Sequence, residues 1–239
     1  MRCQYFARVG NLRTMSDIKL TRTEVRQQQT KLRLREVAYE LMEANGVGAT
    51  TIQQITDGAD IGFGTFYNYA PSKEALAQDV LDCIIHQLGQ RNDLITHLLG
   101  ETDPVRIVAN SVRFVMREMT TDPVFRWWVD RVDVLVDRMR VGFGPFGLRD
   151  IDHAVETGSY SLIEGGPSFA WSQLVWLMAS AGCDIVRGVH PPSYERAACE
   201  AILRIMGVSH DAAHDACTTD LPAAPELAID YAFEVGDLG

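Results

Sequence analysis

Residues 49–76, ATTIQQITDGADIGFGTFYNYAPSKEAL, decide the fold of this chain. Thr50 or Thr51 stands where a hydroxyl caps a helix, directly before a short segment that begins at Ile52 and runs to about residue 57. The two isoleucines of that segment are three residues apart, so they share one side of it. A tight turn at 58–60 ends it. The stretch therefore begins with a short capped helix and a turn.

The second half of the stretch supplies another short segment and the start of a long one. Residues 62–69 are rich in glycine and aromatic residues, and Ile61 before them is placed to fill the turn. Ser72 then caps a long predicted helix from Lys73 to about Leu99. Two short helices joined by a tight turn and braced by a longer helix predict a helix-turn-helix arrangement.

A capping box opens the helix upstream of this stretch. Thr21 and Glu24 have the S/T-x-x-E spacing in which a hydroxyl and a carboxylate satisfy free amides of a first turn. An apolar stripe with helical spacing follows, formed by Leu34, Val37, Ala38, Leu41 and Met42. It ends before Asn45-Gly46, a favourable C-terminal stop. We expect a helix of about 20 residues with one buried face.

Helical signals continue downstream, without the apolar–polar alternation of half-buried strands. Two Asp-Pro pairs open helices, because proline is favoured in a first turn. We expect helices over 104–119, 123–140, 149–157, 168–187 and 193–206, a loop at 142–147, a linker over 209–225 and a final amphipathic turn at 227–233. The predicted fold class is all-α, with an N-terminal three-helix helix-turn-helix domain and a larger C-terminal helical domain.

The stretch from about Arg26 to Leu76 resembles the DNA-binding headpiece of the tetracycline-repressor (TetR) family of bacterial regulators. The resemblance rests on Ala49-Thr50-Thr51-Ile52-x-x-Ile55, on Ala59-Asp60-Ile61 and on Gly64-Thr65-Phe66-Tyr67-Asn68-Tyr69-Ala70-Pro71-Ser72-Lys73-Glu74-Ala75-Leu76. Three residues depart from the family pattern: Asp60 where Gly is usual in the turn, Gly62 where Ser is common, and Ala70 where a packing Phe is usual. The first two affect the turn geometry and one phosphate contact; Tyr69 or Phe66 is expected to fill the space at the third.

The resemblance implies a transcriptional regulator, most simply a repressor, that binds a palindromic double-stranded DNA operator as a homodimer and is released by a small apolar effector. The residues expected at the DNA are Arg26, Thr51, Gly62, Phe63, Gly64, Thr65, Tyr67, Asn68, Tyr69 and Lys73. Glycines at the start of a recognition helix let its backbone amides approach phosphate closely. Hydroxyl, amide and aromatic groups behind them reach base edges or a thymine methyl. The competing interpretation is that 67–69 only pack and cap a helix end.

Charge is distributed unevenly along the chain, whose net charge is −10. Residues 1–35 carry nine Lys and Arg and two acids, a net of +7, and the remaining residues carry a net of −17. A basic leading segment on an acidic body is expected when one end approaches phosphates. A solvated tail is the alternative reading of the same segment. We expect residues 1–20 to form a flexible basic arm, with translation starting at Met1 or at Met15.

We expect the rest of the chain to divide into a DNA-binding domain over 21–72, an effector-binding and dimerisation domain over 73–208, and a linker and tail over 209–239. By resemblance, the helices 168–187 and 193–206 pair with their symmetry mates in a four-helix bundle. Small residues in the middle of the first of these helices permit close approach. The alternative is an ordinary buried helix pair inside a monomer.

Aromatic residues gather in the middle of the body, as they do in a core or in a ligand pocket. The residues expected at an effector site are Phe114, Trp127, Trp128, Arg131, Phe143, Phe146, Tyr160, Trp171, Gln173 and Trp176. They predict an apolar effector, whether acyl, aromatic or polycyclic, that a few polar groups orient.

Other chemistries are weakly indicated. Five widely spaced cysteines without a C-x-x-C pair fit a reducing cytoplasm, and His210, His214 and Cys217 lack a second cluster that would indicate a metal site. Residues 142–147 match G-x-G-x-x-G outside any strand–turn–helix context. We expect no membrane span, because no uncharged apolar run is as long as a span requires. We also expect no cofactor and no enzyme activity, since neither a nucleophile elbow nor an H-E-x-x-H helix occurs. An all-helical small-molecule-binding or catalytic protein with an idle headpiece is the alternative function.

Overall fold

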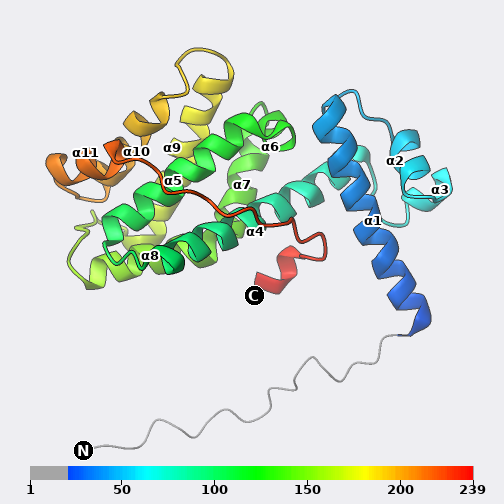
Figure 1. Cartoon of the computed structure of the whole chain (residues 1–239), viewed down its shortest axis with the longest axis horizontal. Coiled ribbons are helices and arrows are strands. Elements are labelled where there is room, and N and C mark those ends of the chain that lie inside the picture. The colour runs from blue at the N-terminus through cyan, green and yellow to red at the C-terminus, as the bar shows by residue number, and fades with distance from the viewer. Residues whose placement is uncertain (1–20, 239) are drawn as a thin grey trace, which may run out of the picture.

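A computed structural model describes residues 21–238 of the chain, and these residues form helices without any strand. The elements are α1 (Arg22–Asn45), α2 (Ile52–Gly58), α3 (Phe63–Phe66), α4 (Lys73–Leu99), α5 (Pro104–Thr121), α6 (Pro123–Trp128), α7 (Val132–Gly142), α8 (Gly144–Glu156), α9 (Gly166–Val186), α10 (Tyr194–Ile205), α11 (His210–Thr218) and a 3-10 turn, η2 (Val235–Leu238). The all-α prediction is confirmed. The small headpiece α1–α3 lies at one end and the larger body at the other, with α4 running from one to the other (Figure 1).

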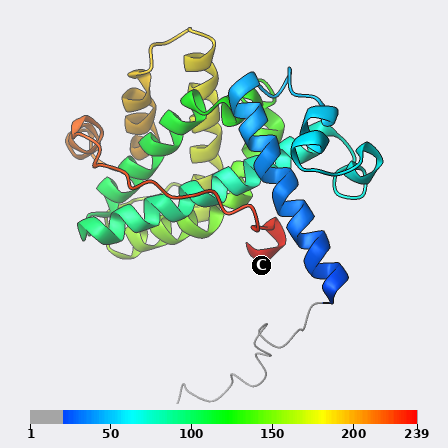
Figure 2. The ribbon, with the colours of Figure 1, turned by 45° about the vertical axis from the view of Figure 1, so that its right-hand side comes forward.

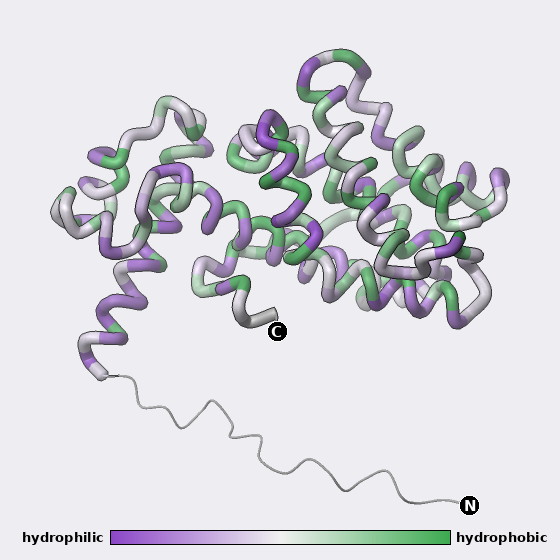
Figure 3. Tube along the Cα trace, turned by 180° about the vertical axis from the view of Figure 1, so that it is seen from behind, coloured by the Kyte–Doolittle hydropathy of each residue, from purple (hydrophilic) through white to green (hydrophobic). Residues whose placement is uncertain are grey.

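Helices α1 and α2 of the headpiece begin where local capping residues place them. Thr21 and Glu24 form both bonds of a capping box at α1, as predicted. Thr51 and Gln54 form a second capping box at α2. Each box satisfies two amides that a helix start would otherwise leave unpaired. The first half of α1 is hydrophilic along its exposed length, whereas its second half packs on α4 (Figure 3).

The body surrounds an apolar core to which α5 and α9 contribute many of the buried side chains. Helix α9 packs against α5, α7, α8 and α10. By length and composition α9 resembles a membrane span, but half of its apolar window is buried inside the protein, as expected for a core helix.

The structure breaks the single helix predicted over 123–140 into α6 and α7. Val129 is fully buried, and its carbonyl oxygen accepts a hydrogen bond from the thiol of Cys183 on α9 (3.2 Å). Turn-like bonds from Val129 N to Arg126 O and from Arg131 N to Trp128 O close the chain there. A tertiary partner for one carbonyl therefore ends a helix that sequence periodicity alone would continue.

The loop predicted over 142–147 is instead the junction of α7 and α8. A side chain at Gly142 would collide with Ile85 of α4, and one at Gly147 would collide with the indole of Trp171 on α9. Pro145 lies in the first turn of α8, where proline is tolerated. These glycines therefore serve close helix approach rather than a flexible loop.

The segment expected as a linker contains helix α11. Ser209 caps it, and Ala213, Ala216 and Cys217 are buried against α5 and α10. Small apolar residues at helical spacing were masked by the Ala/Asp-rich composition. Beyond α11 the chain runs back across α4 to α1 and ends in η2, so no helix forms at 227–233 (Figure 2).

Candidate functional site

Helix α3 presents a small exposed surface at the outer end of the headpiece. Phe63 is 46% exposed and Tyr67 is 51% exposed, and their rings meet edge to face with centroids 5.9 Å apart. Asn68 is exposed beside them, whereas Thr65 is half-buried. Large aromatic side chains left in solvent at the tip of a domain are typical of a surface that meets a partner.

The turn before α3 contains the one non-glycine residue with a left-handed backbone among residues 21–238, Asp60 (φ +54°). Helix α2 ends with a bond from Ile61 N to Thr56 O (3.0 Å), which belongs to a Schellman motif. This is the position where the family pattern usually has glycine. The chain keeps the turn geometry with an aspartate, which tolerates this conformation better than most residues.

The two glycines of α3 have no packing role inside the protein. A side-chain carbon at Gly64 would meet no atom within 4 Å, and one at Gly62 would meet only the Thr65 hydroxyl at an ordinary 3.6 Å. Both glycines have negative φ, so the backbone does not require them either. Space that the fold leaves open at the domain tip is available to an approaching molecule.

Other predicted DNA-contact residues have partners inside the headpiece. The ammonium of Lys73 donates to the carbonyl oxygens of Val47 (2.8 Å), Gly48 (3.1 Å) and Thr50 (2.8 Å). Its three donors are thus engaged in holding the α1–α2 loop, and its positive charge is what remains for a phosphate. Thr51 is exposed within its capping box, and Arg26 is exposed on α1.

Phe66, Tyr69 and Ala70 all contribute to the headpiece core. Phe66 is fully buried, Tyr69 is half-buried against the core, and Ala70 is 3% exposed beneath them. Both residues named as candidates for the space of the usual packing Phe therefore take part in the headpiece core.

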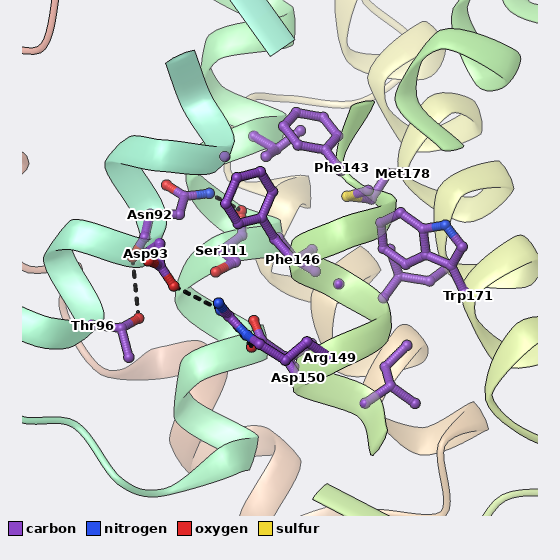
Figure 4. A pocket seen from close by; sticks show the side chains of 17 residues that line it. Asn92, Asp93, Thr96, Ser111, Phe143, Phe146, Arg149, Asp150, Trp171 and Met178 are labelled. Carbon is purple, nitrogen blue, oxygen red and sulfur yellow. Dashed lines mark hydrogen bonds and ion pairs between the residues drawn. The ribbon is translucent and has the colours of Figure 1, made fainter. Parts of the chain in front are cut away.

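The body contains a partly open cavity between α4, α5, α8 and α9, with a volume of about 50 Å³ (Figure 4). Its wall is mainly apolar and aromatic. The lining residues are Gly89, Asn92, Asp93 and Thr96 of α4, Val108, Ser111, Val112 and Val115 of α5, Phe143 before α8, Phe146, Gly147, Arg149, Asp150 and Ile151 of α8, and Trp171, Leu174 and Met178 of α9.

Polar groups are concentrated on one side of the cavity (Figure 4). Asn92 is 92% buried, and its side-chain oxygen has no hydrogen-bond partner although its amide nitrogen reaches the Ser111 carbonyl at 3.5 Å. Arg149 forms ion pairs with Asp93 (2.7 Å) and Asp150 (2.9 Å). Burial raises the pKa of Asp150, and the Arg149 guanidinium offsets part of that rise. A buried acceptor without a donor is costly unless a ligand supplies one.

Family models match both parts of the chain. The model of bacterial regulatory proteins of the tetR family matches residues 34–80, and the model of the tetracyclin repressor-like C-terminal domain matches residues 103–218. The chain belongs to the TetR family. TetR-family members are transcriptional regulators that bind DNA and small molecules, and they are regulators rather than enzymes.

Solved structures of other TetR regulators share the architecture. RolR in complex with resorcinol is 27% identical, with a TM-score of 0.76 over 84% of this chain and 100% of RolR. FadR of Thermus thermophilus, in complex with lauroyl-CoA, is 19% identical, with a TM-score of 0.53 over 74% of this chain and 94% of FadR. NemR of E. coli in its reduced form is 17% identical, with a TM-score of 0.52 over 74% of this chain and 97% of NemR. A comparison with curated proteins found no match.

The cavity brings together three of the predicted effector residues, Phe143, Phe146 and Trp171. The others lie elsewhere. Phe114, Trp128 and Tyr160 are buried outside the lining, Trp127 is half-buried with the Arg131 guanidinium 3.4 Å above its ring, Gln173 is half-buried, and Trp176 is 44% exposed. Aromatic density in the sequence thus marks core, cavity and surface together.

Sequence reasoning missed the polar residues of the cavity, on α4 and α8. Gly89, Asn92, Asp93 and Thr96 follow one another at helical spacing on α4, whose buried side also carries Asp82 and Gln87. Asparagine on the inner face of a helix is uncommon unless it is bonded. Buried polar residues also occur at other positions of α4, so the sequence alone does not single out this site.

Helices α9 and α10 carry exposed apolar side chains on the outside of the body. Phe169 and Trp176 of α9 are 41% and 44% exposed, and Ile205 of α10 is 40% exposed. On α9 the two aromatic residues lie seven residues apart, on one side of the helix. These are the two helices for which the sequence predicts dimer pairing.

Proposed function

We propose that the protein is a transcriptional repressor that binds a palindromic operator as a homodimer and leaves it when a small effector enters the body. One observation carries the proposal: α4 begins in the headpiece at Lys73 and ends beside the cavity, whose wall includes Asn92 and Asp93 of the same helix. A ligand that displaces this end of α4 acts directly on the element that braces the DNA-contact helix. A cytoplasmic location fits this role.

Operator binding is attributed to the exposed surface of α3 and to the basic start of α1. Arg26 on α1 and Arg126 on α6 form a matched pair, since both are exposed arginines and only the former lies in the headpiece. We expect Arg26→Ala to weaken binding to duplexes from the gene's own promoter and to reduce the salt slope by about one. Arg126→Ala should leave both unchanged. Anisotropy titrations at several salt concentrations measure this, and equal slopes in the two variants contradict the assignment.

The effector class that the cavity fits best is a single-ring aromatic molecule with hydroxyl groups. Phe143, Phe146 and Trp171 supply faces for a ring, and the free oxygen of Asn92 supplies an acceptor for one hydroxyl. The Asp93–Arg149 pair supplies further polar contacts near the same side. RolR, whose structure is reported with resorcinol, is the similar regulator that points to the same class.

Calorimetry with resorcinol, catechol and hydroquinone tests this class. Asn92→Leu should weaken binding of at least one of them by about ten-fold, because a buried hydroxyl then loses its acceptor. Gln90→Ala, an exposed change on the same helix, is the control. If all three compounds fail to bind the wild-type protein, the effector class is wrong while operator binding is unaffected.

Dimerisation is attributed to α9 and α10. Phe169, Trp176 and Ile205 leave apolar surface that a symmetry mate would cover. We expect Trp176→Glu to convert dimer to monomer in sedimentation experiments at micromolar concentration. Val155→Glu, at an exposed apolar residue of α8 outside the proposed helix pair, should remain dimeric. A wild-type monomer would overturn this part of the proposal.

A further inference from the structure

The chain beyond α11 is bound along the body and reaches the headpiece. We call residues 219–234 the strap. It begins on α5, where buried Arg113 donates to the Thr219 carbonyl (2.6 Å). It passes α4, where Gln87 donates to the Leu227 carbonyl (2.6 Å), and it ends on α1 (Figure 2). The strap lies outside both matched family segments, which cover residues 34–80 and 103–218.

Arg35 of α1 binds the end of the strap. Its side chain is 3% exposed, and one terminal nitrogen donates to the carbonyl oxygens of Tyr231 and Phe233, each at 2.9 Å. The guanidinium also pairs with Glu234 of the strap (3.2 Å) and with Asp79 of α4 (3.3 Å). One buried cation thus joins the headpiece, the long helix and the C-terminal segment. Buried arginine is costly unless all three sets of partners are in place.

Further contacts hold the strap against both neighbours. The Phe233 ring, 6% exposed, stacks on His86 of α4 with centroids 3.9 Å apart and planes within 5°. Lys31 of α1 pairs with Glu234 at 2.6 Å. A loosely attached segment would not bury an aromatic ring, a guanidinium and two backbone carbonyls together.

The strap lies beside a second contact that joins α1 to the body, because Lys31, Arg35 and Tyr39 are four residues apart on one face of α1. Tyr39 donates to Asp122 Oδ2 (3.0 Å) where α5 meets α6, and its ring lies 6.4 Å from that of Tyr231 in the strap. Helix α1 therefore contacts α4, α6 and the strap. The strap adds to the contacts that limit how far the headpiece can pivot about α4.

We propose that the strap is a second link between body and headpiece, one that fixes the angle of α1 against α4 and thereby raises operator affinity. The affinity part rests on the proposed function; the angle does not. Two headpieces held at a set angle meet successive half-sites without an ordering cost, whereas pivoting headpieces lose entropy on binding. Because the strap also bonds to α4 and α5, which both line the cavity, it moves with the helices that an effector contacts.

The test compares a chain that ends after Pro225, which removes the α1 contacts, with a control chain that ends after Gly236, which keeps them. Spin labels at Glu43→Cys on α1 and Asp152→Cys on α8, in a Cys3→Ser background and diluted with unlabelled protein, report the headpiece-to-body distance. Both label sites are exposed, and Cys83, Cys183, Cys199 and Cys217 are buried. We expect a narrow distance distribution in the control and a broad one in the chain ending after Pro225.

Operator affinity is measured on the same proteins. We expect it to fall about ten-fold when the strap is removed, a coupling of ordinary size, while effector affinity changes by less than about two-fold. A synthetic peptide of residues 226–239, added in excess, should narrow the distribution again and restore affinity. Full-length Phe233→Ala, with exposed Glu226→Gln as its control, gives the same direction if the shortened chain folds poorly.

The possible outcomes separate the two proposals. An unchanged distance distribution in both the shortened chain and Phe233→Ala overturns the strap as a link. A broader distribution with unchanged or higher operator affinity overturns its role in binding. Wild-type protein that binds no operator refutes the proposed function, while the distance measurement still decides whether the strap fixes the headpiece.

Discussion

The headpiece and the cavity are encoded at different ranges along the chain. In the headpiece, the starts of α1 and α2 are fixed within three residues, by Thr21 with Glu24 and by Thr51 with Gln54. In the cavity, residues from Gly89 to Met178 on separate helices must meet. Short-range chemistry sets the first site and packing of distant segments sets the second.

Glycines show the same difference. Gly64 has open space around it, and its backbone conformation does not require glycine. Its lack of a side chain therefore matters only to a molecule that binds there. Gly147 faces the Trp171 ring so closely that any side chain would displace the ring. We therefore expect changes in the headpiece to alter binding more than stability, and changes around the cavity to alter stability first.

The largest effect is expected on α4, where the two regions join. Burial raises the pKa of Asp82 from 3.8 to about 6, although Arg138 at 3.2 Å offsets part of the rise. The folded state therefore holds this proton more tightly than the unfolded state, and stability falls as pH rises from about 4 to about 6. In Asp82→Asn, the free energy of unfolding should fall by about 2–3 kcal/mol less than in the wild type over this pH range.

Urea unfolding of Asp82→Asn and wild type between pH 4 and pH 7.5 measures this difference. Exposed Asp152→Asn serves as the control and should follow the wild-type curve. If the Asp82→Asn and wild-type curves stay parallel across the window, the buried carboxyl is not the cause.

Gly147→Ala tests the close helix packing around the cavity. The added methyl must push the Trp171 indole, whose nitrogen donates to the Arg140 carbonyl (3.2 Å). We expect a loss of about 2 kcal/mol in the free energy of unfolding and weaker effector binding, because the ring also lines the cavity. Thermal unfolding and calorimetry measure both. Wild-type stability in this variant would mean that the helices are less closely packed than described.

Thr51→Ala tests the local encoding of the headpiece. Removal of the hydroxyl breaks the bonds to Gln54 that open α2, at a cost of about 1 kcal/mol. We expect lower operator affinity and unchanged effector affinity. Thr102→Ala, an exposed threonine outside the headpiece, is the control. Loss of effector binding in Thr51→Ala would show that the two regions are not separable in this way.

Gly64→Ala should give the smallest change in stability and separate the effect on operator affinity most clearly from the effect on stability. Alanine favours a helix over glycine and meets no atom here, so we expect a gain of about 0.5 kcal/mol. Operator affinity should nevertheless fall, because a methyl group now stands where DNA approaches. Denaturation and anisotropy measure the two quantities. Unchanged affinity would place the DNA surface elsewhere than α3.

The same contrast explains what the sequence predicted. Capping residues and the 49–76 pattern located the headpiece helices, and α4 begins and ends where expected. The helix break at Val129 involves a hydrogen bond donated by the thiol of Cys183 on α9. The role of Gly147 depends on a tryptophan 24 positions later. No local pattern contains such partners.

The cavity was predicted only in part for the same reason. Phe143, Phe146 and Trp171 were identified as aromatic, but Asn92 is recognised as a site residue only when its oxygen is seen to be buried without a donor. The strap was missed because Arg35 and Glu234 are 199 residues apart and look like ordinary surface charges in the sequence.

The central claim is that the cavity controls the headpiece, and one titration tests it most directly. A labelled duplex from the gene's own promoter is saturated with protein and then titrated with resorcinol, catechol and hydroquinone while anisotropy is followed. We predict that at least one compound releases the duplex, and that Asn92→Leu requires about ten-fold more of it. A compound that binds in the cavity with full occupancy and leaves the duplex bound would contradict the account.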